Sequence, residues 1–204
     1  MAYTVHEIFL TLQGEGRNLG RVAVFIRFAG CNLWSGREED RATAICRFCD
    51  TEFRGGTRHD AASLVREAEA LWPQGQQGRL VVLTGGEPLL QVDAALLDAL
   101  HLAGFTVALE TNGTLPLPGP VDFVCVSPKS TTTLALHRAD ELKLVHPQSD
   151  APPERFADFD APVRWLSPMD GPDLIRNMSL CANYCLEHPG WRLNIQAHKV
   201  WKLP

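Results

Sequence analysis

Three of the six cysteines in this chain fall between residues 31 and 49, and their spacing is suited to holding a metal cluster. Two residues separate Cys46 from Cys49, whereas fourteen separate Cys31 from Cys46. Three thiolates without an evident fourth ligand favour a 4Fe-4S cluster, because each cysteine holds one iron and the remaining iron is free to bind a small molecule. We therefore predict a cluster-binding loop at residues 30–51.

Two other uses of these thiols remain open. Structural zinc normally completes its tetrahedron with a fourth Cys or His, and His59, ten residues beyond Cys49, is the nearby candidate. A CxxC pair by itself is also typical of thioredoxin-like redox motifs, although that use would leave Cys31 without a role.

Composition favours small-molecule chemistry in a reducing compartment. The 204 residues suffice for one domain, 1–204, and no Pro-, Ser- or Gly-rich linker divides them. A formal net charge of −5 without a run of Lys and Arg argues against nucleic-acid or anionic-membrane partners. His6 and Glu7 interrupt the apolar residues of the N-terminus, which predicts neither a signal peptide nor a membrane span. We expect a cytoplasmic protein whose clustered cysteines bind metal instead of forming disulfides.

The other three cysteines have a different setting. Cys125 lies in the apolar run VDFVCV, and Cys181 and Cys185 fall four residues apart on the apolar stripe of a helical pattern. Buried cysteine behaves as a small hydrophobic residue, so we expect all three to pack in the core.

The elements that must position these residues alternate between apolar strands and helices, which indicates an α/β fold. Near-continuous apolar strands predict a buried, mostly parallel sheet, and the segments after the third, fourth and fifth strands are too rich in Pro, Ser and Thr for full helices. We predict a partial (β/α) barrel with fewer helices than a full alternation. The expected strands are 22–29, 79–84, 105–110, 121–126, 141–145, 163–166 and 192–196, and the expected helices cover 61–72, 89–100, with Asp93 as a polar exception, and 174–185.

Compact polar motifs follow most of these strands. Cys31 follows the first strand, GGEP (85–88) the second, ETNGT (110–114) the third, SPK (127–129) the fourth and SPMD (167–170) the sixth. Each motif alone is compatible with an ordinary turn. Because the C-terminal ends of parallel strands meet at one rim, five such loops in succession predict a shared cavity there.

Together these motifs resemble the radical S-adenosylmethionine (SAM) enzymes. The three cysteines after the first barrel strand, the aromatic Phe48 before the last of them and GGEP carry the superfamily likeness, with Cx14CxxC in place of the usual CxxxCxxC. TLQGEG (11–16), FAGCNLW (28–34), CDT (49–51), TGGEP (84–88), ETNGT, SPK and PMDG (168–171) resemble in particular the 7-carboxy-7-deazaguanine synthase family, over most of the chain and in the expected order.

The resemblance implies a reaction and its cofactors. Cys31, Cys46 and Cys49 hold a 4Fe-4S cluster, and SAM bound at the open iron yields a 5′-deoxyadenosyl radical. The substrate is 6-carboxy-5,6,7,8-tetrahydropterin, which contracts to 7-carboxy-7-deazaguanine with loss of ammonia. For Phe48, contact near the adenine and plain packing are both open. The expected SAM-binding residues are Phe48, Gly85, Gly86, Ser127, Pro128, Lys129, Ser167, Pro168, Met169 and Asp170.

A second set of residues is expected to bind the pterin. Arg27 is a lone charge in the first strand and needs an anionic partner, which is either an internal carboxylate such as Glu15 or the carboxylate of the substrate. Gln13 and Glu15 offer the mixed donors and acceptors that an aminopyrimidinone edge requires. The full expected set is Leu12, Gln13, Gly14, Glu15, Arg27, Thr84, His198 and Pro204.

Thr51 and the end of the chain complete the expectations. In the resembled family this threonine helps to bind Mg²⁺, whereas a Thr after Asp is otherwise a common cap or turn residue. The tail 197–204 is expected to close the pocket, with Trp201 and Leu203 as apolar anchors and the carboxylate of Pro204 facing the pterin; a frayed terminus is the alternative.

The expected partners are the pterin, a flavodoxin or ferredoxin as electron donor, and a second copy in a homodimer. Two alternatives to the synthase remain: a radical SAM activase of another protein, and a non-catalytic zinc-binding module.

Overall fold

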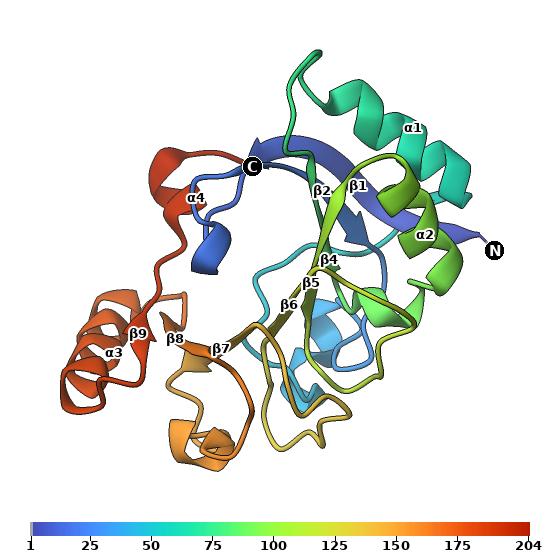
Figure 1. The fold of residues 1–204 in the computed structure, drawn as a ribbon. Helices are drawn as coiled ribbons and strands as arrows, with labels where there is room; N and C mark the ends of the chain where they lie inside the picture. The colour runs from blue at the N-terminus through green and yellow to red at the C-terminus, as the bar shows by residue number, and fades with distance from the viewer. Residues whose placement is uncertain (1) are drawn as a thin grey trace.

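The computed structural model describes residues 2–204 and shows one curved, open sheet of nine strands (Figure 1). The strand order is β3-β1-β2-β4-β5-β6-β7-β8-β9, so the sheet is not closed into a barrel. From β2 to β9 all neighbouring strands are parallel, whereas β1 is antiparallel to both β2 and β3. The strands are β1 (Tyr3–Leu12), β2 (Val22–Phe28), β3 (Thr57–His59), β4 (Leu80–Gly85), β5 (Thr106–Thr111), β6 (Phe123–Val126), β7 (Glu141–His146), β8 (Val163–Pro168) and β9 (Arg192–Leu193).

Helices are fewer than strands, as the sequence predicts. The α-helices are α1 (Ala61–Leu71), α2 (Ala94–Leu102), α3 (Leu174–Glu187) and the short α4 (Ala197–Trp201). No α-helix follows β5, β6 or β7 within the described residues, and only the 3-10 helix η4 (Pro153–Phe156) lies in these connections. The other 3-10 helices are η1 (Gly16–Asn18), η2 (Glu38–Thr43) and η3 (Pro88–Leu90). The predicted partial barrel is therefore confirmed.

The core has two main parts, which lie on the helix-bearing side of the sheet. Helices α1 and α2 pack over β1, β2, β4 and β5 and bury residues such as Leu64 and Leu97 completely. Helix α3 packs beside β7 and β8, where Cys181 is fully buried. Cys125 is also buried on β6, whereas Cys185 is only half-buried against the second part of the core.

Several expected boundaries are wrong at the ends of the sheet. Strand β1 and the short β3 were not expected, and together they extend the sheet by antiparallel pairing. The expected strand 192–196 ends at Leu193, and the chain then enters α4, which was also not expected. β3, β9 and α4 are short, so local pattern indicates them poorly, whereas β1 is a ten-residue strand that the sequence analysis missed.

Asp93 is not a polar residue inside a helix. The segment Pro88–Leu90 is the separate 3-10 helix η3, and α2 begins only at Ala94. Asp93 is its N-cap: its carboxylate accepts the backbone N–H of Leu96 at 3.0 Å and the hydroxyl of Tyr3 at 2.7 Å. A side-chain acceptor at this position satisfies an N–H group that the helix leaves unpaired, which explains the interruption of the apolar pattern.

No helix within residues 2–204 is both long and apolar enough to cross a lipid bilayer.

Candidate active site

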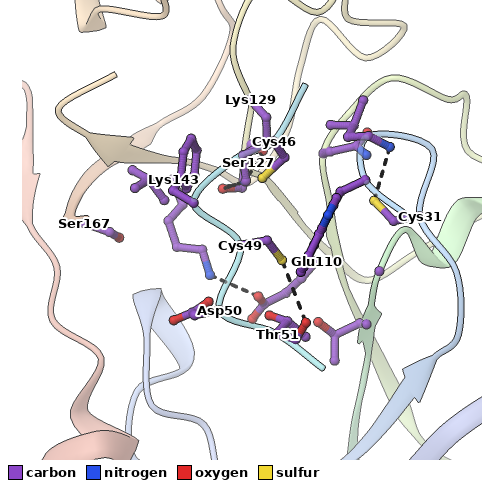
Figure 2. A pocket seen from close by; sticks show the side chains of 18 of the residues that line it. Cys31, Cys46, Cys49, Asp50, Thr51, Glu110, Ser127, Lys129, Lys143 and Ser167 are labelled. Carbon is purple, nitrogen blue, oxygen red and sulfur yellow. Dashed lines mark hydrogen bonds and ion pairs between the residues drawn. The ribbon is translucent and has the colours of Figure 1, made fainter. Parts of the chain in front are cut away.

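The three cysteines of the Cx14CxxC motif line one cavity of about 200 Å³ at the C-terminal ends of the parallel strands. Cys31 follows β2, whereas Cys46 and Cys49 lie on the long loop that returns across the mouth of the sheet. Figure 2 shows their sulfur atoms around a common space, with Ser127, Lys129 and Ser167 on other sides of it. The three thiols thus lie at one cavity, although fourteen residues separate Cys31 from Cys46 in the sequence.

The fourteen-residue excursion between Cys31 and Cys46 is folded around Arg41. Its guanidinium lies 4.1 Å from the ring centroid of Trp34 and donates to the backbone carbonyls of Arg47 and Cys49 at 2.9 and 3.1 Å. Trp34 in turn packs edge-on against Phe53, with ring centroids 5.7 Å apart. This packing returns the chain to the cavity despite the long spacing.

The surroundings of the thiols suit a 4Fe-4S cluster. The backbone N–H of Leu33 points at the sulfur of Cys31 at 3.4 Å, and such hydrogen bonds tune cluster-bound sulfur. The hydrogen bond between Cys46 and Cys49 lowers the pKa of the Cys49 thiol and raises that of Cys46, and burial raises the pKa of Cys31. Within residues 2–204 no three His, Cys, Asp or Glu side chains are grouped closely enough to hold a single metal ion. His59 contacts Glu67 at 3.1 Å and hydrogen-bonds Thr57, so its ring is engaged on the far edge strand β3.

Gly85 and Gly86 line the cavity, and their backbone conformation depends on the absence of side chains. Gly85 has a φ of +127°, and a Cβ atom there would collide with the backbone of Phe28. A Cβ on Gly86 would collide with the carbonyl of Gly30 and come within 3.0 Å of the side chain of Cys31. The glycines therefore permit β4 to approach the cysteine-bearing end of β2. The same lack of side chains would let their backbone groups approach a ligand closely.

Most of the expected SAM-binding residues line this cavity, and two do not. Phe48, Ser127, Lys129, Ser167, Pro168 and Asp170 all face it. Pro128 is buried elsewhere, and Met169 lines a neighbouring hollow beside Phe48 and Gln148. Lys129 has no carboxylate partner among the described residues; its ammonium donates to the carbonyl and hydroxyl of Ser127, both at 2.6 Å. Burial lowers the pKa of this lysine.

A second cavity of about 300 Å³ adjoins the first, and every residue expected to bind the pterin lines it: Leu12, Gln13, Gly14, Glu15, Arg27, Thr84, His198 and Pro204. The two cavities share the lining residues Glu15, Asp50, Thr51, Thr84, Glu110 and Gln196. Thr51, the expected Mg²⁺ ligand, thus lies at the junction of the cavities.

The internal partner of Arg27 is Glu7, which the sequence analysis did not consider. The Nε atom of Arg27 donates to Glu7 at 2.6 Å, and its guanidinium lies 5.6 Å from the ring centroid of Phe9. Glu15, the partner considered from the sequence, instead contacts Lys143. Neither Nη atom of Arg27 donates a hydrogen bond to the described residues, so the end of the guanidinium remains available to the second cavity.

Three residues of the tail 197–204 line the second cavity, His198, Lys199 and Pro204, but the expected apolar anchors do not hold the tail. Trp201 and Leu203 are 42 and 37% exposed. Polar contacts hold the tail instead: the N–H of Ala197 donates to the carbonyl of Gly14 at 2.9 Å, and the hydroxyl of Thr11 donates to the carbonyl of Pro204 at 3.3 Å. Figure 1 shows the C-terminus beside the end of β1.

Gly14 is required at this contact. A side chain at residue 14 would collide with the ring and backbone of His198, so the glycine lets the tail lie directly on the loop after β1. His198 is thereby held half-buried in the wall of the cavity, and burial lowers its pKa, which keeps the ring uncharged at neutral pH.

Besides Glu7, Asp50 and Glu52, which line the second cavity, four charged residues in or beside the site were missed from the sequence. Glu87 is fully buried and accepts the N–H groups of Leu89 and Asn112 at 3.0 and 2.7 Å, which fixes the GGEP loop against the ETNGT loop. The others are Glu110, Lys143 and Lys199. Glu87 and Glu110 lie in motifs that the sequence analysis named, whereas a lone lysine in the apolar strand ELKLV was the available signal for Lys143.

An incomplete parallel barrel with three cysteines at its C-terminal rim defines a radical SAM protein, and residues 40–147 match the Radical SAM superfamily. Two curated proteins named 7-carboxy-7-deazaguanine synthase, from Caulobacter vibrioides and Bordetella pertussis, are each 54% identical to this chain, with all of both chains covered. The crystal structure of QueE from Escherichia coli matches with a TM-score of 0.74 and 29% identity, covering 97% of this chain and 95% of that one. The chain belongs to the 7-carboxy-7-deazaguanine synthase family of radical SAM enzymes.

Family membership brings a 4Fe-4S cluster and SAM as cofactors, and the three cysteines and the cavity that they line fit both. It also argues against the two alternatives from the sequence, an activase of another protein and a non-catalytic zinc module.

Proposed function

We propose that this protein converts 6-carboxy-5,6,7,8-tetrahydropterin to 7-carboxy-7-deazaguanine with loss of ammonia, a step in the biosynthesis of 7-deazapurines such as the queuosine precursor. The observation that carries the proposal is the junction of two cavities, one lined by the three cysteines and the other by the TLQGEG loop and Arg27. A radical formed in the first cavity would lie next to a substrate in the second, because the two cavities share lining residues.

The cofactors supply the difficult chemistry of this reaction. When bound, a reduced cluster and SAM provide the 5′-deoxyadenosyl radical that removes one hydrogen atom from the pterin. The role of the chain is to bind and orient both molecules. Ser127, Lys129, Ser167 and Asp170 offer hydroxyl, ammonium and carboxylate groups around the adenosyl and methionyl parts of SAM.

The second cavity offers groups that match the two ends of the pterin. The free Nη edge of Arg27 forms a fork for the substrate carboxylate, held in place by the pair with Glu7. At the other end, Glu15 and the terminal carboxylate of Pro204 are acceptors for the amino and ring N–H groups, with the uncharged ring of His198 beside them. The reaction needs no net oxidant, because substrate and product differ by one molecule of ammonia.

We also assign a Mg²⁺ site to Thr51. Its hydroxyl is a hard oxygen ligand at the junction of the cavities, next to Asp50. One protein hydroxyl does not hold Mg²⁺ alone, so the pterin carboxylate and water would complete the shell. Mg²⁺ is therefore expected to bind weakly in the absence of the pterin.

The electron donor and a second copy of this chain are inferred from exposed side chains. A low-potential flavodoxin or ferredoxin in the cytoplasm would deliver the electron, and Ile45 and Arg47 are exposed beside Cys46 on the outer face of the cluster loop. A homodimer is consistent with the exposed apolar side chains of Ile175 and Leu186 on α3, which are 77 and 83% exposed.

The decisive experiment is turnover under reducing, oxygen-free conditions. The reconstituted protein is incubated with SAM, Mg²⁺, dithionite and 6-carboxytetrahydropterin, and the deazapurine and ammonia are quantified together. Equal amounts of the two products are expected, and none from Cys31→Ala. A brown, fully loaded protein that cleaves SAM but leaves the pterin unchanged would contradict the assigned substrate while keeping the radical SAM class.

A further inference from the structure

A network of four polar side chains lies between the two cavities and is anchored on Lys143. The ammonium of Lys143, on β7, donates to Glu15 and to Oε2 of Glu110 on β5, the latter at 3.0 Å. Figure 2 shows this lysine reaching toward Glu110, although β6 separates their two strands in the sheet. Gln13 completes the network, because its Nε2 donates to Oε1 of Glu110 at 2.9 Å and its Oε1 accepts the backbone N–H of Glu15 at 3.0 Å.

These bonds leave one oxygen of the network without a protein partner. Glu110 uses both of its carboxylate oxygens, one for Lys143 and one for Gln13. Glu15 uses only Oε2, and no hydrogen bond from residues 2–204 reaches its Oε1. Glu15 lines both cavities, so this oxygen is the acceptor that the network presents at their junction.

Lys143 supplies the positive charge between the two carboxylates of this buried network. Its side chain is 9% exposed, and two carboxylates buried together without a cation would share a proton. Burial raises the pKa of Glu110, but the charge and hydrogen bond of Lys143 outweigh burial, and the pKa is lowered. Lys129, Cys125, Glu141 and His198 are the other titratable groups that act on this network.

We propose that Lys143 is a positioning residue for the substrate: it fixes the orientation of the Glu15 carboxylate, so that Oε1 accepts the amino and ring N–H groups of the reduced pterin. This inference rests on the proposed function and deepens it. Two carboxylates and one ammonium give the network a net charge of −1, which is the charge that a single ionised Glu15 would carry alone.

The net charge of the network can be changed by one substitution and restored by a second, which provides a test. Lys143→Met keeps the length of the side chain but removes the cation, so Glu15 and Glu110 would share a proton and the pterin would lose its acceptor. The double variant Lys143→Met with Glu110→Gln leaves Glu15 as the one carboxylate and restores the net charge of −1. Glu110→Gln alone serves as the matched control, since Lys143 keeps Glu15 and Gln13 can keep an amide oxygen as its acceptor, while the second acceptor of residue 110 is lost.

Binding is measured anaerobically with the cluster oxidised, so that no turnover occurs, and with SAM present. For Lys143→Met the Kd of 6-carboxytetrahydropterin is expected to rise about tenfold or more, the scale of one hydrogen bond to a charged group. In the double variant it should return to within about threefold of the unaltered enzyme, because the two substitutions are coupled. The Kd of SAM and the iron content should change little in either variant.

Each outcome decides the inference. An equal rise in the Kd of the pterin in the single and double variants would overturn the inference. Lys143 would then be either a direct ligand or a structural residue. If Lys143→Met does not fold, the double variant decides alone, because the inference requires it to bind the pterin. Failure of the unaltered enzyme to bind the pterin would instead overturn the proposed function, and this inference with it.

Discussion

The ammonium of Lys199, in the C-terminal tail, joins Asp50 to Asp170. It lies 2.6 Å from Oδ2 of Asp50, which stands between the cluster ligand Cys49 and Thr51, and it also contacts Oδ2 of Asp170 in the loop after β8. One side chain of the tail therefore connects the cluster loop with the loop expected to line the SAM site.

Lys199→Met is expected to loosen the tail without disturbing the cluster. The two carboxylates would lose their shared cation, so the KM for the pterin should rise about 5- to 10-fold, the effect of about 1 kcal/mol or slightly more for a half-exposed network. Iron content should stay unchanged. A variant with normal KM would show that the polar contacts of Ala197 and Pro204 hold the tail by themselves.

The three cluster cysteines are distinguished from the buried ones by iron content. Cys31→Ala, Cys46→Ala and Cys49→Ala should each prevent stable cluster formation, because every thiolate holds one iron. Cys125→Ala is the control, since that thiol is buried on β6 away from the cavity. Iron and sulfide are measured per chain after anaerobic reconstitution; full loading of the Cys31 variant would refute the long-spacing motif.

Arg41 is predicted to stabilise the long excursion of the cluster loop. Arg41→Ala removes the contact with Trp34 and the two bonds to backbone carbonyls, so the cluster should be lost several-fold faster to a chelator, for a cost of about 1–2 kcal/mol. Arg37→Ala is the matched control, because that side chain is 68% exposed and contacts only Glu39. Equal rates of iron loss would mean that the loop does not depend on Arg41.

Arg27 is expected to recognise the substrate carboxylate through its planar fork. Arg27→Lys keeps the charge and the pairing with Glu7 but loses the paired donors, so pterin binding should weaken by about 1.5–3 kcal/mol while SAM binding hardly changes. Both dissociation constants are measured by calorimetry. Parallel loss of both ligands would assign Arg27 to the structure of the sheet instead.

The terminal carboxylate of Pro204 is tested by adding residues at either end. A short Gly-Ser extension after Pro204 would move the carboxylate out of the second cavity, which should raise the KM for the pterin or lower kcat. A tag of equal length before Met1 controls for the added chain. If both proteins have the same kinetic constants, the carboxylate plays no part in binding.

The sequence by itself determined the chemistry of the site. Cysteine spacing, GGEP, TLQGEG and the polar ends of successive strands are local features, and they predicted both the class of cofactor and the rim at which the residues meet. All eight residues expected to bind the pterin line one cavity. Arg27 and Thr84 come from the ends of the parallel strands β2 and β4, whereas the TLQGEG loop follows the antiparallel strand β1 and the remaining residues lie in the C-terminal tail.

Only the tertiary structure shows which charged residues pair and which strands lie at the ends of the sheet. Arg27 pairs with Glu7 across the antiparallel contact of β1 with β2, a strand pairing that was not expected. Lys143 joins Glu15 and Glu110 over separations of 128 and 33 residues, and the tail reaches β1 over 193 residues. A charge in a sequence shows that a partner is needed, but the partner is chosen by distance in the folded chain, which no local pattern encodes.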